Sequence, residues 1–283
     1  MIIASMLLPL MLQVGPDPAS GGVPDHSALV QDRPPREVPV TEPEPSWLAE
    51  CFELIDQDPA RAHVRAQVER ERTEGNERVL ANHCLGLAAT KLERWREAEA
   101  AFIAARDEVP QDDLRLRARM GAMAANAAMA VNESRRALLI LNAALVNARA
   151  SSAGDMTAFI LIDRARALVN IGQLEDAEVS LAEARQLRPD DGEARLLAAT
   201  LLRRLGRLEE AQEQIEEAAR IDPLNPQVGL EAGVIAVLDR RDDAARASWQ
   251  SVIAMAPDGP EAKIARAYLE QLGPASPPIS PAP

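Results

Sequence analysis

Three prolines at a constant interval constrain the fold of this chain more than any other feature. Pro189, Pro223 and Pro257 stand 34 residues apart, and each of them closes an Ala-rich segment. A fixed period of this length is typical of repeat proteins, in which one supersecondary unit recurs and buries its apolar face only against its neighbours. The spacing therefore predicts a stack of short helical hairpins.

Small and large apolar residues recur in register with these prolines. In each 34-residue block the twentieth position is Ala, the twenty-fourth is large and apolar, and the twenty-seventh is Ala or Val. Such a pattern lets two helices approach closely while the large residue fills the groove of the next hairpin. The blocks are residues 79–112, 158–191, 192–225 and 226–259, with Phe102, Leu181, Ile215 and Trp249 at the large position.

A further block restores the register in the interval between Pro110 and Pro189, which is longer than two repeats. If this block spans residues 118–151, the surplus predicts a lengthened first helix over Asp112–Val131 and a longer loop at Ser151–Asp155. Asp155 or Ser152 could then cap the following helix, since short polar side chains accept from free helix N–H groups.

Glycine and proline mark the expected helix ends. Gly172 and Gly206 stand where a first helix turns into a second one, a position that favours a left-handed residue. A degenerate first hairpin is expected after residue 46, with Pro59 in the first turn of its second helix, and Pro260–Leu272 is expected to be an end cap. The expected fold is an all-α, right-handed α-solenoid of about five helical hairpins plus a C-terminal capping helix.

These blocks resemble the tetratricopeptide repeat of bacterial proteins, which combines a Leu-Gly pair, here Leu85 and Gly86, with Ala, Phe, Ala and a terminal Pro. The resemblance covers most of residues 79–272. It implies a concave groove, lined by the first helices, that binds a peptide or helix of a partner protein. The groove positions it implies are Leu80, His83, Leu87, Phe159, Ile162, Arg166, Leu196, Thr200, Arg203, Leu230 and Val234, with Lys91, Asn170, Arg204 and Leu238 beside them.

Composition supports an all-α protein and excludes one class of partner. Hydrophobic residues make up 47% of the chain and aromatic ones only 2%, so Ala and Leu, which favour helix, dominate the apolar share. The formal net charge is −13, from 44 acidic and 31 basic residues. Because nucleic-acid binding depends on a basic face, we expect a protein or peptide partner and no nucleic acid.

The chain offers little material for a reactive site. It contains three His and two Cys and lacks the common catalytic and nucleotide-binding motifs, so we expect no catalytic residue, metal or cofactor. Cys51 and Cys84 stand nearly one repeat apart and could form a disulfide between adjacent first helices. Two buried free thiols, or a metal site that includes His83 or His63, are the alternatives.

Both ends of the chain differ from the repeat region. Residues 1–14 are mostly apolar and resemble a signal-peptide core, although no basic residue precedes them; an uncleaved membrane tether is the alternative. Residues 15–45 form a Pro-rich segment for which we expect a disordered linker, and residues 273–283 are expected to be a similar tail. The expected solenoid spans residues 46–272, and the expected location is the periplasm or exterior, with the cytoplasm as the alternative.

These observations favour a non-catalytic scaffold in the cell envelope that binds a partner protein in its groove. Two alternatives remain open at this point: an all-α regulator or enzyme subunit that holds a small ligand in the groove, and a cytoplasmic adaptor.

Overall fold

The computed structural model describes residues 47–274, and within this range the chain folds into thirteen helices and no strand. The expected signal-like segment, the Pro-rich linker and nearly all of the C-terminal tail lie outside the described residues. The helices are α2 (Trp47–Gln57), α3 (Pro59–Arg72), α4 (Gly75–Lys91), α5 (Trp95–Glu108), α6 (Leu114–Ala130), α7 (Ser134–Ala150), α8 (Gly154–Asn170), α9 (Leu174–Leu187), α10 (Gly192–Arg204), α11 (Leu208–Ile221), α12 (Pro226–Leu238), α13 (Asp242–Met255) and α14 (Pro260–Leu272).

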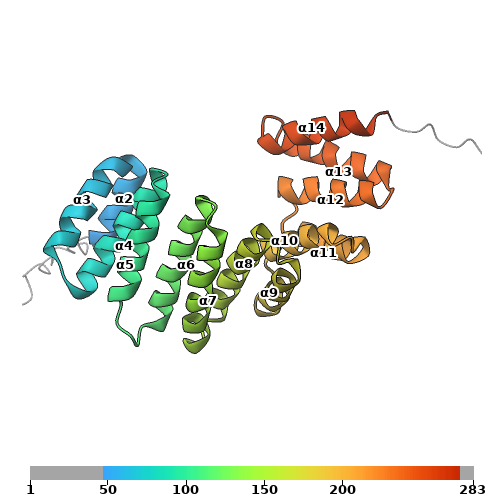
Figure 1. The fold of residues 1–283 in the computed structure, drawn as a ribbon. Helices are drawn as coiled ribbons and strands as arrows, with labels where there is room; N and C mark the ends of the chain where they lie inside the picture. Colours follow the sequence, from blue (N-terminus) through green and yellow to red (C-terminus); the bar gives the residue numbers. More distant parts are fainter. Residues whose placement is uncertain (1–46, 275–283) are drawn as a thin grey trace, which may run out of the picture. The chain divides into compact units, whose positions relative to one another are not determined.

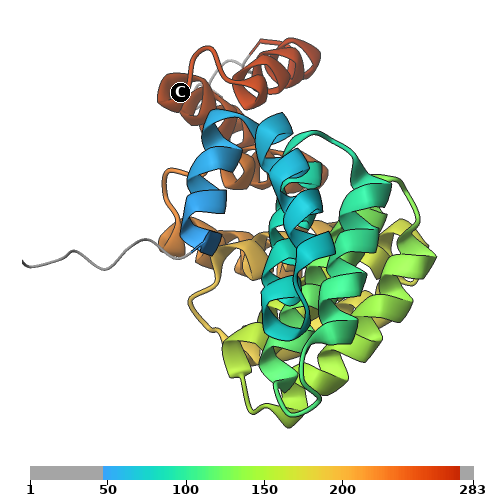
Figure 2. The same cartoon turned by 90° about the vertical axis from the view of Figure 1, so that its left-hand side faces the viewer.

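Each helix packs on the helices before and after it in the sequence (Figure 1). Figure 2 shows the same order for the helices coloured blue to green, which lie side by side. In the described part of the chain this makes six pairs, from α2/α3 to α12/α13, followed by α14. The all-α repeat fold predicted from the sequence is therefore confirmed, with one pair more than the approximate number expected.

The turn inside most pairs is closed by one residue with positive φ. Gly172 and Gly206 occupy this position as predicted, with φ values of 81° and 77°. The residue after each glycine donates its N–H to a carbonyl near the end of the first helix, as in Gln173 N to Leu168 O at 2.9 Å, which satisfies an otherwise free helix carbonyl. Glu93 and Arg240 adopt the same backbone conformation without being glycine.

Prolines and capping side chains set the helix ends between pairs. Pro110, Pro189, Pro223 and Pro257 each follow the last residue of a second helix or its C-cap, because the residue before proline avoids helical geometry. Asp191 then caps α10 through its carboxylate, which accepts from Ala194 N at 2.9 Å. The 34-residue interval therefore marks real helix boundaries.

One local prediction was wrong. The segment expected to form a long loop at Ser151–Asp155 is a tight turn, because Ser152 adopts positive φ and α8 already begins at Gly154. Neither Ser152 nor Asp155 caps α8, whose N-cap residue is Ala153. The surplus residues instead lengthen the helices α6, α7 and α8 to 17 residues each, where their backbone groups are hydrogen-bonded within the helix.

The eighth and twenty-fourth positions of the five blocks are matched in size. Where the twenty-fourth residue is aromatic, the eighth is glycine: a Cβ on Gly86 would lie 2.5 Å from Phe102, and one on Gly233 would lie still closer to Trp249. Where it is aliphatic, the eighth residue is alanine. These pairs are Ala125 with Leu141, Ala165 with Leu181, and Ala199 with Ile215.

No helix among residues 47–274 is both long and apolar enough to cross a membrane.

Candidate partner-binding face of the first helices

Three cavities of the described chain are lined by residues at equivalent positions of the 34-residue blocks. They lie beside the first helices of the pairs, and the ninth and thirteenth positions of the blocks line all three. Register therefore places one column of side chains along this face, which we call the first-helix face. From block to block the column contains Leu87 and Lys91, Asn126 and Ala130, Arg166 and Asn170, Thr200 and Arg204, and Val234 and Leu238.

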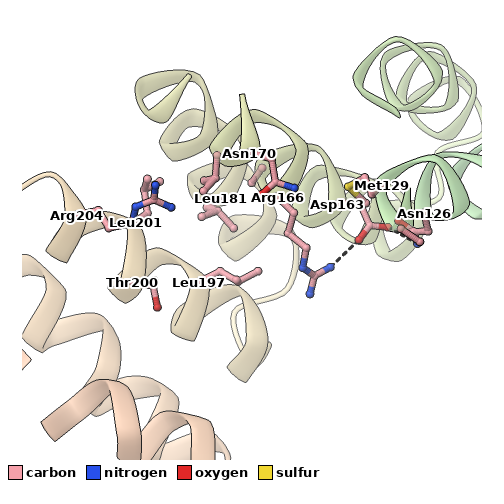
Figure 3. A pocket seen from close by; sticks show the side chains of 13 residues that line it. Asn126, Met129, Asp163, Arg166, Asn170, Leu181, Leu197, Thr200, Leu201 and Arg204 are labelled. Carbon is pink, nitrogen blue, oxygen red and sulfur yellow. Dashed lines mark hydrogen bonds and ion pairs between the residues drawn. The ribbon is translucent and has the colours of Figure 1, made fainter. Parts of the chain in front are cut away.

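The largest of these spaces is the central cavity, with a volume of about 590 Å3. Residues of α6, α8 and α10 and Leu181 of α9 surround it, and Figure 3 shows Thr200 and Arg204 along α10 and Arg166 and Asn170 along α8. Most of the lining is apolar. The apolar side chains are Met129, Ala130, Ala165, Val169, Leu181, Leu197 and Leu201.

A polar network crosses the central cavity from α6 to α10. The Asp163 carboxylate accepts from the Asn126 amide at 3.0 Å and pairs with the Arg166 guanidinium at 2.6 Å. Arg166 also pairs with Glu193 at the start of α10. Burial raises the pKa of Asp163, and the hydrogen bonds from Asn126 and Arg166 oppose this rise. The network therefore joins the Asp163 carboxylate, 13% exposed, directly to α6 and, through Arg166, to Glu193 of α10.

Polar groups without a partner also border the central cavity. Arg204 is exposed and forms no hydrogen bond or ion pair with any described residue, and the Thr200 hydroxyl is also unpaired within this part of the chain. The adjacent Arg203 differs, because its Nε pairs with the largely buried Glu231 carboxylate of α12 at 2.5 Å. The two neighbouring arginines thus differ: Arg203 joins α10 to α12, and Arg204 lines the cavity with no partner in the described part of the chain.

The two outer cavities differ in their lining. The N-terminal one, about 450 Å3, has a mixed lining of Phe52, Ile55, Asp56, Leu87, Thr90, Lys91, Glu93 and Trp95. The C-terminal one, about 310 Å3, is bordered by Val234, Val237, Leu238, Trp249, Tyr268, Gln271 and Leu272. Charged side chains therefore line the N-terminal and central cavities but not the C-terminal one.

The structure distributes the eleven groove positions expected from the sequence among different environments. Arg166 and Thr200 line the central cavity, Leu87 the N-terminal one and Val234 the C-terminal one. The remaining seven line none of the three cavities. Ile162 and His83 are buried; Leu80 and Phe159 are exposed, with Arg188 stacked on the Phe159 ring; Leu196 and Leu230 pack partly into the core; and Arg203 pairs with Glu231.

The sixth block position was missed by the sequence analysis. It contributes Asp163 and Leu197 to the central cavity, and Asn126 and Met129 enter from the lengthened α6. The column of ninth positions, Asn126, Arg166 and Thr200, could have been found in the sequence by applying the block register to α6 as well. No sequence pattern indicates that Asp163 forms a hydrogen bond with Asn126.

The other candidate residues gather near the N-terminal end. Cys51 of α2 and Cys84 of α4 lie with their Cα atoms 6.2 Å apart and their sulfur atoms within bonding distance. His83 lies between the rings of Phe52 and Phe102, and its Nε2 has no hydrogen-bond partner among the described residues. Burial, with a contribution from the Arg119 charge, lowers the pKa of His83 to about 4. His63 instead contacts Glu97, with its Nε2 2.7 Å from the carboxylate.

Within residues 47–274 no three His, Cys, Asp or Glu side chains are grouped so that they could hold a metal ion.

Comparisons with known proteins agree with this architecture. The sequence profile of the tetratricopeptide repeat matches residues 171–232, which run from the end of α8 into α12. A comparison with curated protein sequences finds no match.

Several solved structures share the fold at low sequence identity. PilF of Pseudomonas aeruginosa is 13% identical with a TM-score of 0.61, covering 78% of this chain and 96% of its own. PilW, described as a widely conserved type IV pilus biogenesis factor, is 17% identical with a TM-score of 0.63, covering 76% and 94%. The apo form of the quorum sensor NprR from B. thuringiensis is 12% identical with a TM-score of 0.63, covering 78% and 68%. The profile match places tetratricopeptide repeats at residues 171–232, and the solved structures share the helical-repeat fold of most of the described chain.

Proposed function

We propose that this protein is a non-catalytic scaffold that binds a peptide or helix of a partner protein on the first-helix face. The observation that carries the proposal is the central cavity, which is lined by the same two block positions from three successive pairs. A periodic lining of this kind suits a partner segment that runs across several helices, because each repeat offers it an equivalent place to bind.

The chemistry of the central cavity also favours a protein segment. Its floor is apolar, which suits the side chains of an amphipathic segment, while Asn126, Asn170 and Thr200 place amide and hydroxyl groups at its border for the polar atoms of a peptide. A cavity of about 590 Å3 is also within the usual range for small-molecule sites. A small ligand is therefore the outcome that the experiment must distinguish.

Site-specific photo-crosslinking in cells tests this proposal. A crosslinking amino acid at Thr200 is expected to give one dominant protein adduct, whereas the same group at Leu139, an exposed residue of the second helix α7, is expected to give none of that size. The Thr200→Arg substitution, which places a long side chain at the cavity, should abolish the adduct when the crosslinker is at Asn170. No adduct at Thr200 or Asn170, combined with a small molecule retained through native purification, would favour the ligand-holding alternative.

We further propose that the scaffold acts in the cell envelope. The proposal is supported by the apolar segment at residues 1–14, by the proximity of Cys51 and Cys84, and by the shared fold with a pilus biogenesis factor. Disulfides persist in oxidising compartments, so the bond and the location are linked proposals. Intact mass of the protein from envelope and cytosolic fractions, with and without thiol alkylation, tests both. A reduced, full-length chain found only in the cytosol would contradict them.

A further inference from the structure

We propose that the central cavity binds partner segments in which an Asp or Glu side chain lies within one helical turn of a large aliphatic residue. In this proposal the Arg204 guanidinium binds the acidic group. This inference rests on the proposed scaffold function and specifies the chemistry of its partner.

One positive charge at the central cavity has no partner among the described residues. The lining contains Arg166, Arg204 and Asp163, and Glu193 pairs with Arg166 beside it, so the positive and negative charges of these four side chains balance. Both carboxylates pair with Arg166. Arg204 has no such partner among the described residues. The guanidinium that is available to a partner is therefore that of Arg204, and an acidic group complements it.

Apolar side chains lie close to Arg204. Leu201 and Leu197 lie one and two turns before it on α10 (Figure 3), and Leu181 and Val169 are among the other apolar residues of the lining. A guanidinium at the border of an apolar cavity can bind a carboxylate while an adjacent apolar side chain enters the cavity. The two groups must then be close together in the partner, which an amphipathic segment provides.

Arg204 differs from its neighbour Arg203, which stabilises the fold. Arg203 is fixed by Glu231, so its removal would leave a largely buried carboxylate without a partner. Arg204 is exposed and unpaired within the described chain, so its replacement removes no hydrogen bond or ion pair between the described helices. An effect of Arg204 substitutions on binding can therefore be separated from an effect on folding.

Selection from a library of random 12-residue peptides displayed on phage tests the inference with the full-length protein. The wild type is expected to enrich peptides with Asp or Glu within four residues of Leu, Ile, Val or Met, and to deplete Lys and Arg. The Arg204→Glu variant should reverse this preference. Arg135→Glu, a matched charge reversal at an exposed and unpaired arginine of α7, should select the same peptides as the wild type.

Affinity measurements then quantify the role of Arg204. Replacing the acidic residue of the best selected peptide by Gln should weaken its binding to the wild type about three- to tenfold, as for a partly exposed charge-assisted hydrogen bond. The same replacement should have no effect on binding to Arg204→Gln. Fluorescence anisotropy with labelled peptides measures both values, and circular dichroism shows whether the variants remain folded.

Three results would overturn the inference: no acidic preference in the wild-type selection, an unchanged preference with Arg204→Glu, or no peptide selected at all. Each of these can occur while a protein is still crosslinked at Thr200. In that case the scaffold proposal stands and only the acidic partner class is removed. Conversely, acidic peptides that bind when no protein is crosslinked in cells would support the recognition chemistry and contradict the cellular role.

Discussion

The apolar faces at the two ends of the described solenoid are covered by different contacts. An end pair has only one neighbour, so its apolar face is covered on one side only. At the N-terminal end, Cys51 of α2 and Cys84 of α4 lie together in a cluster that includes Ala62 and Ala66. At the C-terminal end, Trp249 packs against Tyr268 of α14, with ring centroids 5.2 Å apart. The proposed disulfide at one end and an aromatic contact at the other thus take the place of the missing neighbour.

The ends also differ in how they respond to solution conditions. The N-terminal end contains Cys51 and Cys84, whose proposed bond depends on redox conditions. It also contains the buried His83, whose protonation depends on pH. The residues from α12 to α14 contain neither Cys nor His. We therefore expect the two ends to unfold separately under conditions that affect only one of them, since a solenoid is stabilised by nearest-neighbour contacts.

The largest expected effect is the loss of the proposed disulfide. A bond across 33 residues contributes about 3–4 kcal/mol to the free energy of unfolding on the chain-entropy account. The Cys51→Ala/Cys84→Ala variant should therefore show faster amide hydrogen exchange in α2, α3 and α4. Exchange in α12–α14 is the internal control and should not change. Equal acceleration at both ends, or none, would show that the ends are not independent or that the bond does not form.

Acidification should weaken the N-terminal end through His83. Its pKa is about 4 in the folded protein and 6.5 for an unperturbed histidine, so the unfolded chain binds a proton between these values while the folded chain does not. Stability should therefore fall as the pH decreases from 6.5 to 4, by about 3 kcal/mol. Urea unfolding at both pH values should show that His83→Leu loses less free energy of unfolding on acidification than the wild type does. An identical loss in the variant would assign the effect to carboxylates instead.

The C-terminal end should be sensitive to packing. In Gly233→Ala, the added methyl group overlaps the Trp249 ring and should lower the free energy of unfolding by about 1–3 kcal/mol. Trp249→Leu should reduce this penalty, because the central pairs combine alanine with an aliphatic residue at the same two positions. Urea unfolding of the two single variants and the double variant gives the coupling energy. Strict additivity would mean that the two positions are not matched in size.

The smallest expected effect concerns the turns of the pairs near the ends. Glu93 and Arg240 have φ values of 58° and 59°, which cost free energy in any residue with a Cβ. Glu93→Gly and Arg240→Gly should each stabilise the protein by about 0.5–1 kcal/mol, and Gly206→Ala should destabilise it by a similar amount. Thermal unfolding followed by circular dichroism measures these shifts. A loss of stability in both glycine variants would contradict the inference that positive φ at Glu93 and Arg240 costs free energy.

The sequence by itself determined the repeat and its boundaries. Pro189, Pro223 and Pro257 mark the ends of second helices, because proline keeps the residue before it out of helical geometry, and Gly172 and Gly206 mark turns that need positive φ. These are local effects of the backbone and need no partner. The same local reasoning failed at Ser151–Asp155, where a polar composition typical of loops instead forms a tight turn and the first turn of α8.

The tertiary structure decided the site. Sequence register could place Arg166 and Thr200 on one face, but only helix packing brings Asn126 and Asp163 together. Only the structure shows that, among residues 47–274, Arg203 has an ion-pair partner and Arg204 has none. The physical reason is that an ion pair depends on the distance between residues of different repeats. That distance is set by how neighbouring helices pack, which the 34-residue period does not specify.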